Sequence, residues 1–169
     1  MPSLDFEEIV SRYYPMLYRF ALSLSRNEFD ACDLTQETFS IWAKKGHLLR
    51  DTTKVKSWLF TTLYREFISG LRRETRWPKQ EISEVEDELP AMVPEAPHAI
   101  EAAEVMKALQ SLDEAFRAPL ALFYLQEQSY EEIALILDIP VGTVMSRLSR
   151  GKQKLQQALA RRQSREESP

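Results

Sequence analysis

The residues best suited to chemistry are basic ones. Between Val141 and Arg165 the chain carries seven Lys or Arg residues and no acidic residue, although its formal net charge is −4. A negative net charge argues against a nucleic-acid binder, but here the charges are segregated along the chain. Positive charge without intervening acids suits contact with phosphates. By itself, this pattern fits a DNA-binding helix and a solvated surface helix equally well.

The residues just before and within this basic segment favour DNA binding. A helix-turn-helix needs a small residue where its helices cross, a tight break, and an apolar residue early in the second helix. Ala134, the run Asp138-Ile139-Pro140 and Val144 meet these needs. Glycine is the usual turn residue, and Asp138 can replace it because aspartate adopts turn conformations. We therefore predict a helix-turn-helix over residues 129–155.

Helical geometry then divides the side chains of the second helix. If Val144 and Leu148 face inward, the outer face is available to DNA. Arg150 has the geometry for a bidentate contact to guanine, and serines can bond base edges. The residues predicted to contact DNA are Thr143, Met145, Ser146, Arg147, Ser149, Arg150, Lys152 and Lys154, of which Arg147, Lys152 and Lys154 suit phosphates.

Enzymatic chemistry has much weaker support. Asp33 and Glu37 lie one helical turn apart. Two carboxylates at this spacing could act as an acid–base pair or hold a metal ion. The two histidines, His47 and His98, do not lie near a carboxylate cluster with metal-ligand spacing, and no glycine-rich phosphate loop occurs. Cys32 is better explained as a small packing residue than as a reactive thiol. We expect no enzyme activity, no metal and no cofactor.

Hydrophobic periodicity predicts an all-α fold whose first bundle has three helices. Apolar residues recur every three or four positions over residues 6–24, 28–45 and 55–73. Pro15 should bend or divide the first helix, and Gly46 should close the second. The polar stretch 46–56 is too long for a minimal turn, which makes it a candidate functional loop.

A second bundle follows an acidic linker that contains proline. Residues 77–104 carry one basic side chain against eight acidic ones, and no apolar period is sustained up to Pro97. Helical spacing resumes at Ala99. Capping boxes at Ser111 and Ser129 should start further helices, with a kink at Pro119 and a last helix over 141–161 before a polar tail. We predict domains at 1–76 and 99–165, joined by 77–98.

Nothing in the sequence predicts insertion into a membrane. The chain lacks a run of about 20 apolar residues, and its N-terminus lacks a basic start followed by an apolar stretch. The expected location is therefore cytoplasmic.

Three segments of the chain resemble a known family. Residues 129–155 look like region 4 of the extracytoplasmic-function (ECF) group of sigma-70-type factors, residues 30–45 resemble its region 2.2, and residues 58–73 its regions 2.3 and 2.4. The resemblance implies promoter recognition and transcription initiation, with promoter DNA and the RNA polymerase core (β′ and β subunits) as partners. Control would come from a separate anti-sigma factor or from expression level.

The resemblance also implies roles for individual residues. In the region 2.2 motif, Asp33, Gln36 and Glu37 would present a polar ridge to the β′ coiled coil, with Phe39 and Trp42 packed beneath. The melted −10 strand would follow a basic path. The residues of that path are Lys54, Lys56, Arg65, Arg72, Arg73 and Arg76, beside Trp77. The family commonly has Asn at position 65 and Asp at position 69, so Arg65 and Ser69 alter this surface. Trp58 is better explained as a core residue than as a surface on which bases stack. By the same resemblance, the linker would take the place of region 3.2.

Two other classes of protein compete with this interpretation. A sigma mimic would bind an anti-sigma factor without engaging promoters, and Arg65 and Ser69 lend that alternative slight support. A response-regulator-type transcription factor would share the helix-turn-helix but would not explain the region 2 motifs. The intact basic recognition helix argues against the sigma mimic, and the region 2 motifs argue against the transcription factor.

Overall fold

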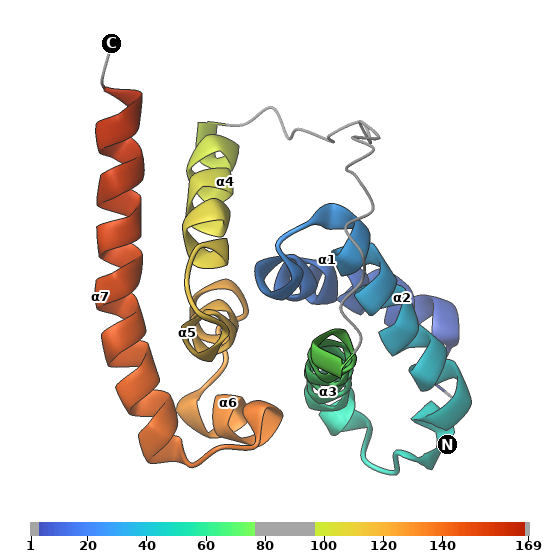
Figure 1. Ribbon diagram of the computed structural model, residues 1–169. Helices are drawn as coiled ribbons and strands as arrows, with labels where there is room; N and C mark the ends of the chain where they lie inside the picture. Colours follow the sequence, from blue (N-terminus) through green and yellow to red (C-terminus); the bar gives the residue numbers. More distant parts are fainter. Residues whose placement is uncertain (1–3, 77–96, 168–169) are drawn as a thin grey trace.

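The computed structural model describes residues 4–76 and 97–167, and in these ranges the chain is helical with short connections (Figure 1). The two predicted helical bundles are present. The elements are α1 (Phe6–Ser25), α2 (Glu28–Lys45), α3 (Val55–Arg76), α4 (Pro97–Gln110), α5 (Glu114–Leu120), α6 (Tyr130–Leu137) and α7 (Val141–Glu166), with 3₁₀ turns at Gly46–Leu48 and Thr52–Lys54. The predicted linker lies almost entirely outside the described residues.

Side-chain caps fix where the first two helices begin. The Asp5 carboxylate accepts a hydrogen bond from the Glu7 N–H at 3.2 Å. The Asn27 side chain accepts one from the Asp30 N–H at 2.8 Å. Each cap satisfies a backbone donor that the first turn of a helix cannot pair. α1 continues through Pro15 as one helix, so the alternative of two separate pieces is wrong. Pro15 has no N–H to donate to the backbone carbonyl one turn earlier. Because Pro15 is exposed, that carbonyl is accessible to water instead.

Gly46 ends α2 for a reason that the sequence did not suggest. Its φ is −58°, so the backbone needs no left-handed conformation there. Instead, a Cβ at this position would lie 2.6 Å from Cδ2 of Trp42. The Trp42 ring in turn meets the Trp58 ring edge-on at 5.1 Å between centroids, and the side chain of Trp42 is buried. Glycine is therefore required by close packing, and Trp58, which is partly buried, packs against the core as predicted.

The second bundle differs from its prediction at the start of α5. Ser111 does not cap this helix, because its hydroxyl donates to the Ala108 carbonyl at 2.6 Å and closes the end of α4. Asp113 takes the N-cap position, and the Glu114 carboxylate reaches another helix instead. Beyond Pro119, the helix passes into a π-helical turn over Ala121–Leu125, so the expected irregularity lies just after the proline.

The last helix is longer than predicted. α7 continues to Glu166, through residues that the sequence suggested were a polar tail. Two contacts explain the extension. Leu155 and Ala158 pack against the core, and Arg162 Nε donates to Glu104 Oε2 at 2.7 Å, which ties α7 to α4. A helix of 26 residues is about 39 Å long.

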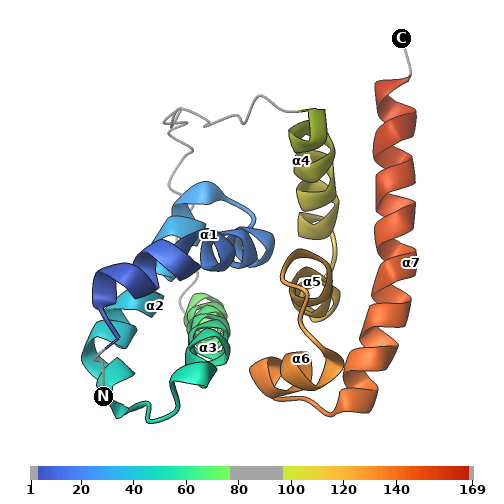
Figure 2. The ribbon, with the colours of Figure 1, turned by 180° about the vertical axis from the view of Figure 1, so that it is seen from behind.

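The two bundles lie against each other (Figures 1 and 2). α1 packs on α4 and α5, and α3 packs on α6. Buried apolar residues from both bundles form one continuous cluster. The sequence predicted the bundles but not this packing.

Candidate nucleic-acid and polymerase interfaces

The turn between α6 and α7 has helix-turn-helix geometry. A capping box opens α6: the Glu132 N–H donates to Ser129 Oγ at 3.1 Å, and the Ser129 N–H donates to Glu132 Oε2 at 2.8 Å. Asp138 ends the helix in the left-handed conformation (φ 55°, ψ 51°), and the Ile139 N–H donates to the Ala134 carbonyl at 3.1 Å. Asp138 thus provides the turn that glycine usually makes.

The inner side of α7 is fixed by packing against α5. Val144 and Leu148 are buried, as predicted. Gly151 is buried as well, and a Cβ there would lie 3.0 Å from Leu120 Cδ1 and 3.4 Å from Phe116 Cβ. Sequence reasoning missed this residue. An isolated glycine in a helical pattern often marks a close approach of two backbones.

The outer side of α7 presents most of the predicted DNA contacts to solvent. Met145, Ser146, Ser149, Arg150, Lys152 and Lys154 are exposed, whereas Thr143 and Arg147 are half-buried. The Ser146 hydroxyl donates to the Thr143 carbonyl at 3.1 Å, so it points back along the helix. Lys154 Nζ lies 5.4 Å from the centre of the Phe116 ring, which places it beside α5. Arg150 and Lys152 are therefore the basic side chains most free to reach DNA.

The ridge predicted to bind polymerase lies along α2. Asp33, Gln36 and Glu37 are exposed, and Phe39 is buried beneath them. The Phe39 ring stacks on Tyr14 with 6.1 Å between centroids, which anchors α2 to α1. An exposed polar row over a fixed core suits a docking surface.

The basic path predicted for the −10 strand lies on α3 and the loop before it. Lys54, Arg65, Arg72 and Arg73 are exposed, Lys56 is half-buried, and the side chain of Arg76 lies outside the described residues, as does Trp77. In the loop, Asp51 accepts hydrogen bonds from the Thr53 hydroxyl at 2.6 Å and the Thr53 N–H at 3.0 Å. These bonds hold the pKa of Asp51 below its usual value, so the loop has an ionised anchor beside Lys54.

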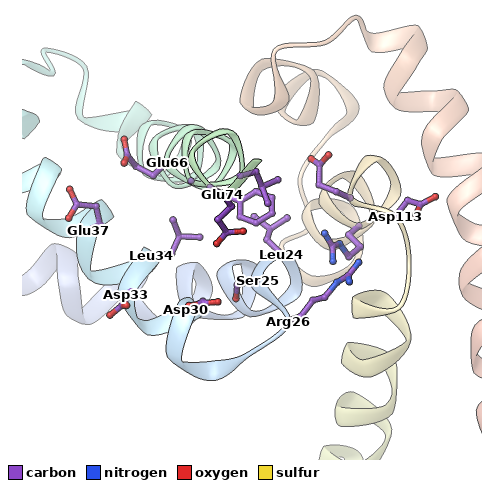
Figure 3. A pocket seen from close by; sticks show the side chains of 15 residues that line it. Leu24, Ser25, Arg26, Asp30, Asp33, Leu34, Glu37, Glu66, Glu74 and Asp113 are labelled. Carbon is purple, nitrogen blue, oxygen red and sulfur yellow. The ribbon is translucent and has the colours of Figure 1, made fainter. Parts of the chain in front are cut away.

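A cavity of about 600 Å³ opens between the bundles (Figure 3). Leu24, Leu34, Phe67 and Leu71 give it apolar walls. Its charged lining consists of Asp30, Asp33, Glu37, Glu66, Glu74, Asp113, Glu114, Arg26 and Arg117. Figure 3 shows Asp30, Asp33 and Glu37 along α2, with Glu66 and Glu74 on the neighbouring α3. The predicted polymerase ridge therefore borders the cavity.

Arg117 is an unusual part of this lining. Its side chain is buried, at 4% exposure, and neither Nε nor Nη1 has a hydrogen-bond partner among the described residues. Burial lowers the pKa of Arg117 and the nearby Arg26 lowers it further, while Glu114 and Asp113 act in the opposite direction. A buried donor without a partner is destabilising. No local sequence pattern indicated a role for Arg117.

Polar contacts connect the bundles beside the cavity. Tyr64 Oη donates to Glu114 Oε1 at 2.8 Å. Burial and this hydrogen bond raise the pKa of Tyr64, while the charge of Arg147 acts against them. Further side-chain bonds to backbone carbonyls run from Gln126 to Met16 at 3.1 Å, from Gln110 to Leu22 at 3.0 Å and from Arg26 to Leu112 at 3.5 Å.

One more contact joins α3 to the segment before α6. With its amide oriented to match its neighbours, Gln128 donates to Glu132 Oε2 at 2.9 Å and accepts from Lys56 Nζ at 3.3 Å. Lys56, which is predicted to contact DNA, thus lies at the contact between the bundles.

The part of the chain that the structure describes offers neither a metal site nor a helix that could span a membrane. Within residues 4–76 and 97–167, no three His, Cys, Asp or Glu side chains gather in a way that could hold a metal ion. None of the described helices has the length and apolar character needed to cross a bilayer.

Family models place both bundles in one class of protein. Residues 9–76 match the model "Sigma-70 region 2", and residues 102–155 match "Sigma-70, region 4". These matches, on two bundles in this order with a helix-turn-helix in the second, define a sigma-70-type factor.

Individual relatives narrow the class. The chain is 32% identical to the ECF RNA polymerase sigma factor SigM of Bacillus subtilis, over 90% of this chain and 93% of that protein. It is 36% identical to the ECF RNA polymerase sigma factor SigE of Mycolicibacterium smegmatis, over 97% of this chain but only 64% of that protein's length. The chain belongs to the ECF group of RNA polymerase sigma factors. Sigma factors of this group direct promoter recognition and transcription initiation.

A solved structure shares the arrangement. The sigma factor RpoE of Bartonella quintana, in complex with the anti-sigma factor NepR, matches with a TM-score of 0.75 and 31% identity, over 92% of this chain and 97% of that one. The likeness extends over both bundles.

Proposed function

We propose that this chain carries RNA polymerase core to promoters, with residues 1–76 binding core and the −10 element and residues 99–165 binding the −35 element. Residues 77–98 connect the two parts. The observation that carries the proposal is the α6–α7 pair, a capped helix-turn-helix whose second helix is basic and has no acidic residue from Val141 to Arg165. A protein with this role works where the polymerase is, in the cytoplasm.

In this proposal, α7 lies in the major groove at the −35 element. Thr143, Met145, Ser146, Ser149 and Arg150 face the bases, and Arg147, Lys152 and Lys154 face phosphates. Both residues can reach DNA, because Arg150 and Lys152 are exposed on α7. Arginine is suited to a bidentate contact with guanine, and lysine acts as a point charge on phosphate.

The α2 ridge docks on the β′ subunit of the core through Asp33, Gln36 and Glu37, while Phe39 keeps the ridge in place from below. Exposed side chains with little packing can be replaced without loss of the fold. A defect in core binding caused by a change on this ridge therefore reports on the interface itself.

Co-purification with core polymerase tests the ridge. Gln36→Lys combined with Glu37→Lys should abolish association with core while helical content, followed by circular dichroism, stays unchanged. Gln157→Lys on α7 is the matched control, an exposed glutamine changed in the same way far from α2. Retained association of the double variant would refute the assignment of α2.

The −10 element is held by the basic path on α3. Lys54, Lys56, Arg65, Arg72, Arg73 and Arg76 supply positive charge along one strand, with bases captured at the loop before α3. The exposure of Lys54, Arg65, Arg72 and Arg73 supports this assignment. A basic groove beside stacking surfaces is the usual basis of single-strand binding.

An anti-sigma factor is the proposed regulator, and the cavity between the bundles is its proposed site. The Bartonella relative was solved with such a partner. Apolar walls, a rim rich in carboxylates and the unpaired Arg117 suit an amphipathic helix that carries basic side chains and one carboxylate. Because Asp33 and Glu37 border the cavity, a partner bound there would compete with core polymerase.

A further inference from the structure

The outer side of α7 has one feature that positive charge does not explain. Val141 and Met145 are large apolar side chains, yet they are 37% and 52% exposed. They lie four residues apart, so they are neighbours on the surface of the helix. Elsewhere on α7, Val144 and Leu148 are buried and Leu155 is half-buried. Two exposed apolar side chains therefore lie among the residues predicted to contact DNA.

The middle of this outer side is made of small residues. Ser146 and Ser149 have short side chains, and Gly142 has none; a Cβ at Gly142 would meet nothing within 4 Å. The Ser146 hydroxyl donates to the Thr143 carbonyl at 3.1 Å, so its proton is already used within the helix. Because the middle is low, longer side chains on either edge extend beyond it.

The two edges differ in chemistry. Met145 and Arg150 are five residues apart, which separates them by roughly 140° around the helix axis. Arg150 exposes a guanidinium group that can donate two hydrogen bonds to guanine. Met145 exposes carbon and sulfur, which cannot replace the hydrogen bonds that a polar base edge loses when water is displaced. Met145 therefore favours a partner surface that is itself apolar.

The major groove of DNA offers one apolar group, the 5-methyl group of thymine. The other distinguishing groups of the base edges there are hydrogen-bond donors or acceptors. A methionine side chain is unbranched and adaptable, so it can follow the shape of a methyl group. Contact between the two removes from water an apolar surface that the free protein leaves exposed, which is favourable.

We propose that Met145, with Val141 beside it, reads the 5-methyl group of one thymine in the −35 element. The recognition helix then selects a T·A pair through an apolar contact on one edge, while Arg150 bonds guanine on the other. This inference rests on the proposed function, because it takes α7 to be the reader of the −35 element. It adds the base that is selected and the group by which it is recognised.

Removal of that methyl group alone tests the inference. The preferred −35 sequence is first selected from randomised duplex DNA by the full-length chain bound to core polymerase, and each thymine in it is then replaced by uracil. Uracil keeps the hydrogen-bonding groups of thymine and lacks only the methyl group. At one position the replacement should weaken binding by about three- to fivefold, the loss expected for roughly one buried methylene group.

Variants at position 145 assign this loss to one side chain. Met145→Gln keeps the length of the side chain but replaces the thioether with an amide, so thymine and uracil should bind equally well at that position. The amide should also shift the preference toward adenine, which glutamine can contact through two hydrogen bonds. Met145→Leu keeps an apolar contact and should still favour thymine over uracil. Leu135→Gln on α6 is the matched control, an apolar side chain at 68% exposure changed in the same way, and it should leave the thymine-to-uracil ratio as in the unaltered chain.

The outcomes separate this inference from the proposed function. If selection enriches no sequence, the chain does not read a −35 element, and the proposed function and the inference both fail. The function stands and the inference is wrong if a sequence is enriched but contains no thymine, or if all its thymines tolerate uracil. The same holds if Met145→Gln discriminates against uracil as strongly as the unaltered chain does, since the methyl group is then read by another residue.

Discussion

Replacing Gly151 with alanine tests how tightly the recognition helix is held. In an open helix interior, Gly→Ala stabilises by about 0.5–1 kcal/mol. At Gly151 the new Cβ would lie 3.0 Å from Leu120 Cδ1 and 3.2 Å from Leu120 Cγ. Leu120 is fully buried, at 0% exposure, so it has little room to move. Overpacking of this kind costs about 1–3 kcal/mol, so we expect a net loss of about 0.5–2 kcal/mol.

Gly142 provides the matched control on the same helix. A Cβ there meets nothing within 4 Å, and the residue is exposed. Urea unfolding followed by circular dichroism should therefore show Gly151→Ala destabilised and Gly142→Ala unchanged or slightly more stable, with equal slopes. If Gly151→Ala were as stable as Gly142→Ala, the close packing of α7 on α5 would be wrong.

Three further predictions concern a helix end, a cap and the DNA surface. Gly46→Ala should destabilise by about 1–3 kcal/mol in urea unfolding, because its Cβ would lie 2.6 Å from the buried Trp42 ring; a neutral effect would contradict the packing. Ser129→Ala should cost about 0.5–2 kcal/mol in the same assay through loss of the α6 cap, and no loss would argue against the capping box. At the preferred −35 sequence, Arg150→Ala should cost about 1–3 kcal/mol and relax discrimination at one base position, while Lys152→Ala should weaken all sequences alike and lower the salt slope by about one. A uniform loss for Arg150→Ala, measured on a panel of −35 mutants at two salt concentrations, would make it a phosphate contact.

Local patterns in the sequence predicted most of the helices. The bounds of α2 and α6 agree with the structure, because Asn27, Ser129 and Asp138 act within a few residues of their own positions. The inward direction of Val144 and Leu148 was also predictable, since helical periodicity alone determines which residues share a face. Local signals are reliable when no distant group competes for the residues that they pair.

Where contacts between residues far apart in sequence determine the structure, the sequence-based prediction was wrong or absent. The capping box predicted at Ser111 fails because Glu114 bonds to Tyr64, 50 residues earlier in the chain. α7 extends past the predicted end because Arg162 pairs with Glu104. The cavity, the unpaired Arg117 and the contacts between the bundles depend on how two domains pack, which no local pattern encodes. The assignment of individual residues to polymerase and DNA stays a prediction.

The most direct measurement of the central claim is in vitro transcription with purified core polymerase on fragments of the host genome. Added to core, the chain should produce transcripts that start at discrete sites, and Gln36→Lys combined with Glu37→Lys should remove them while Gln157→Lys leaves them unchanged. Core polymerase that gives the same transcripts with and without the chain would contradict its role as a sigma factor. That result, together with binding to an anti-sigma factor, would instead identify a sigma mimic.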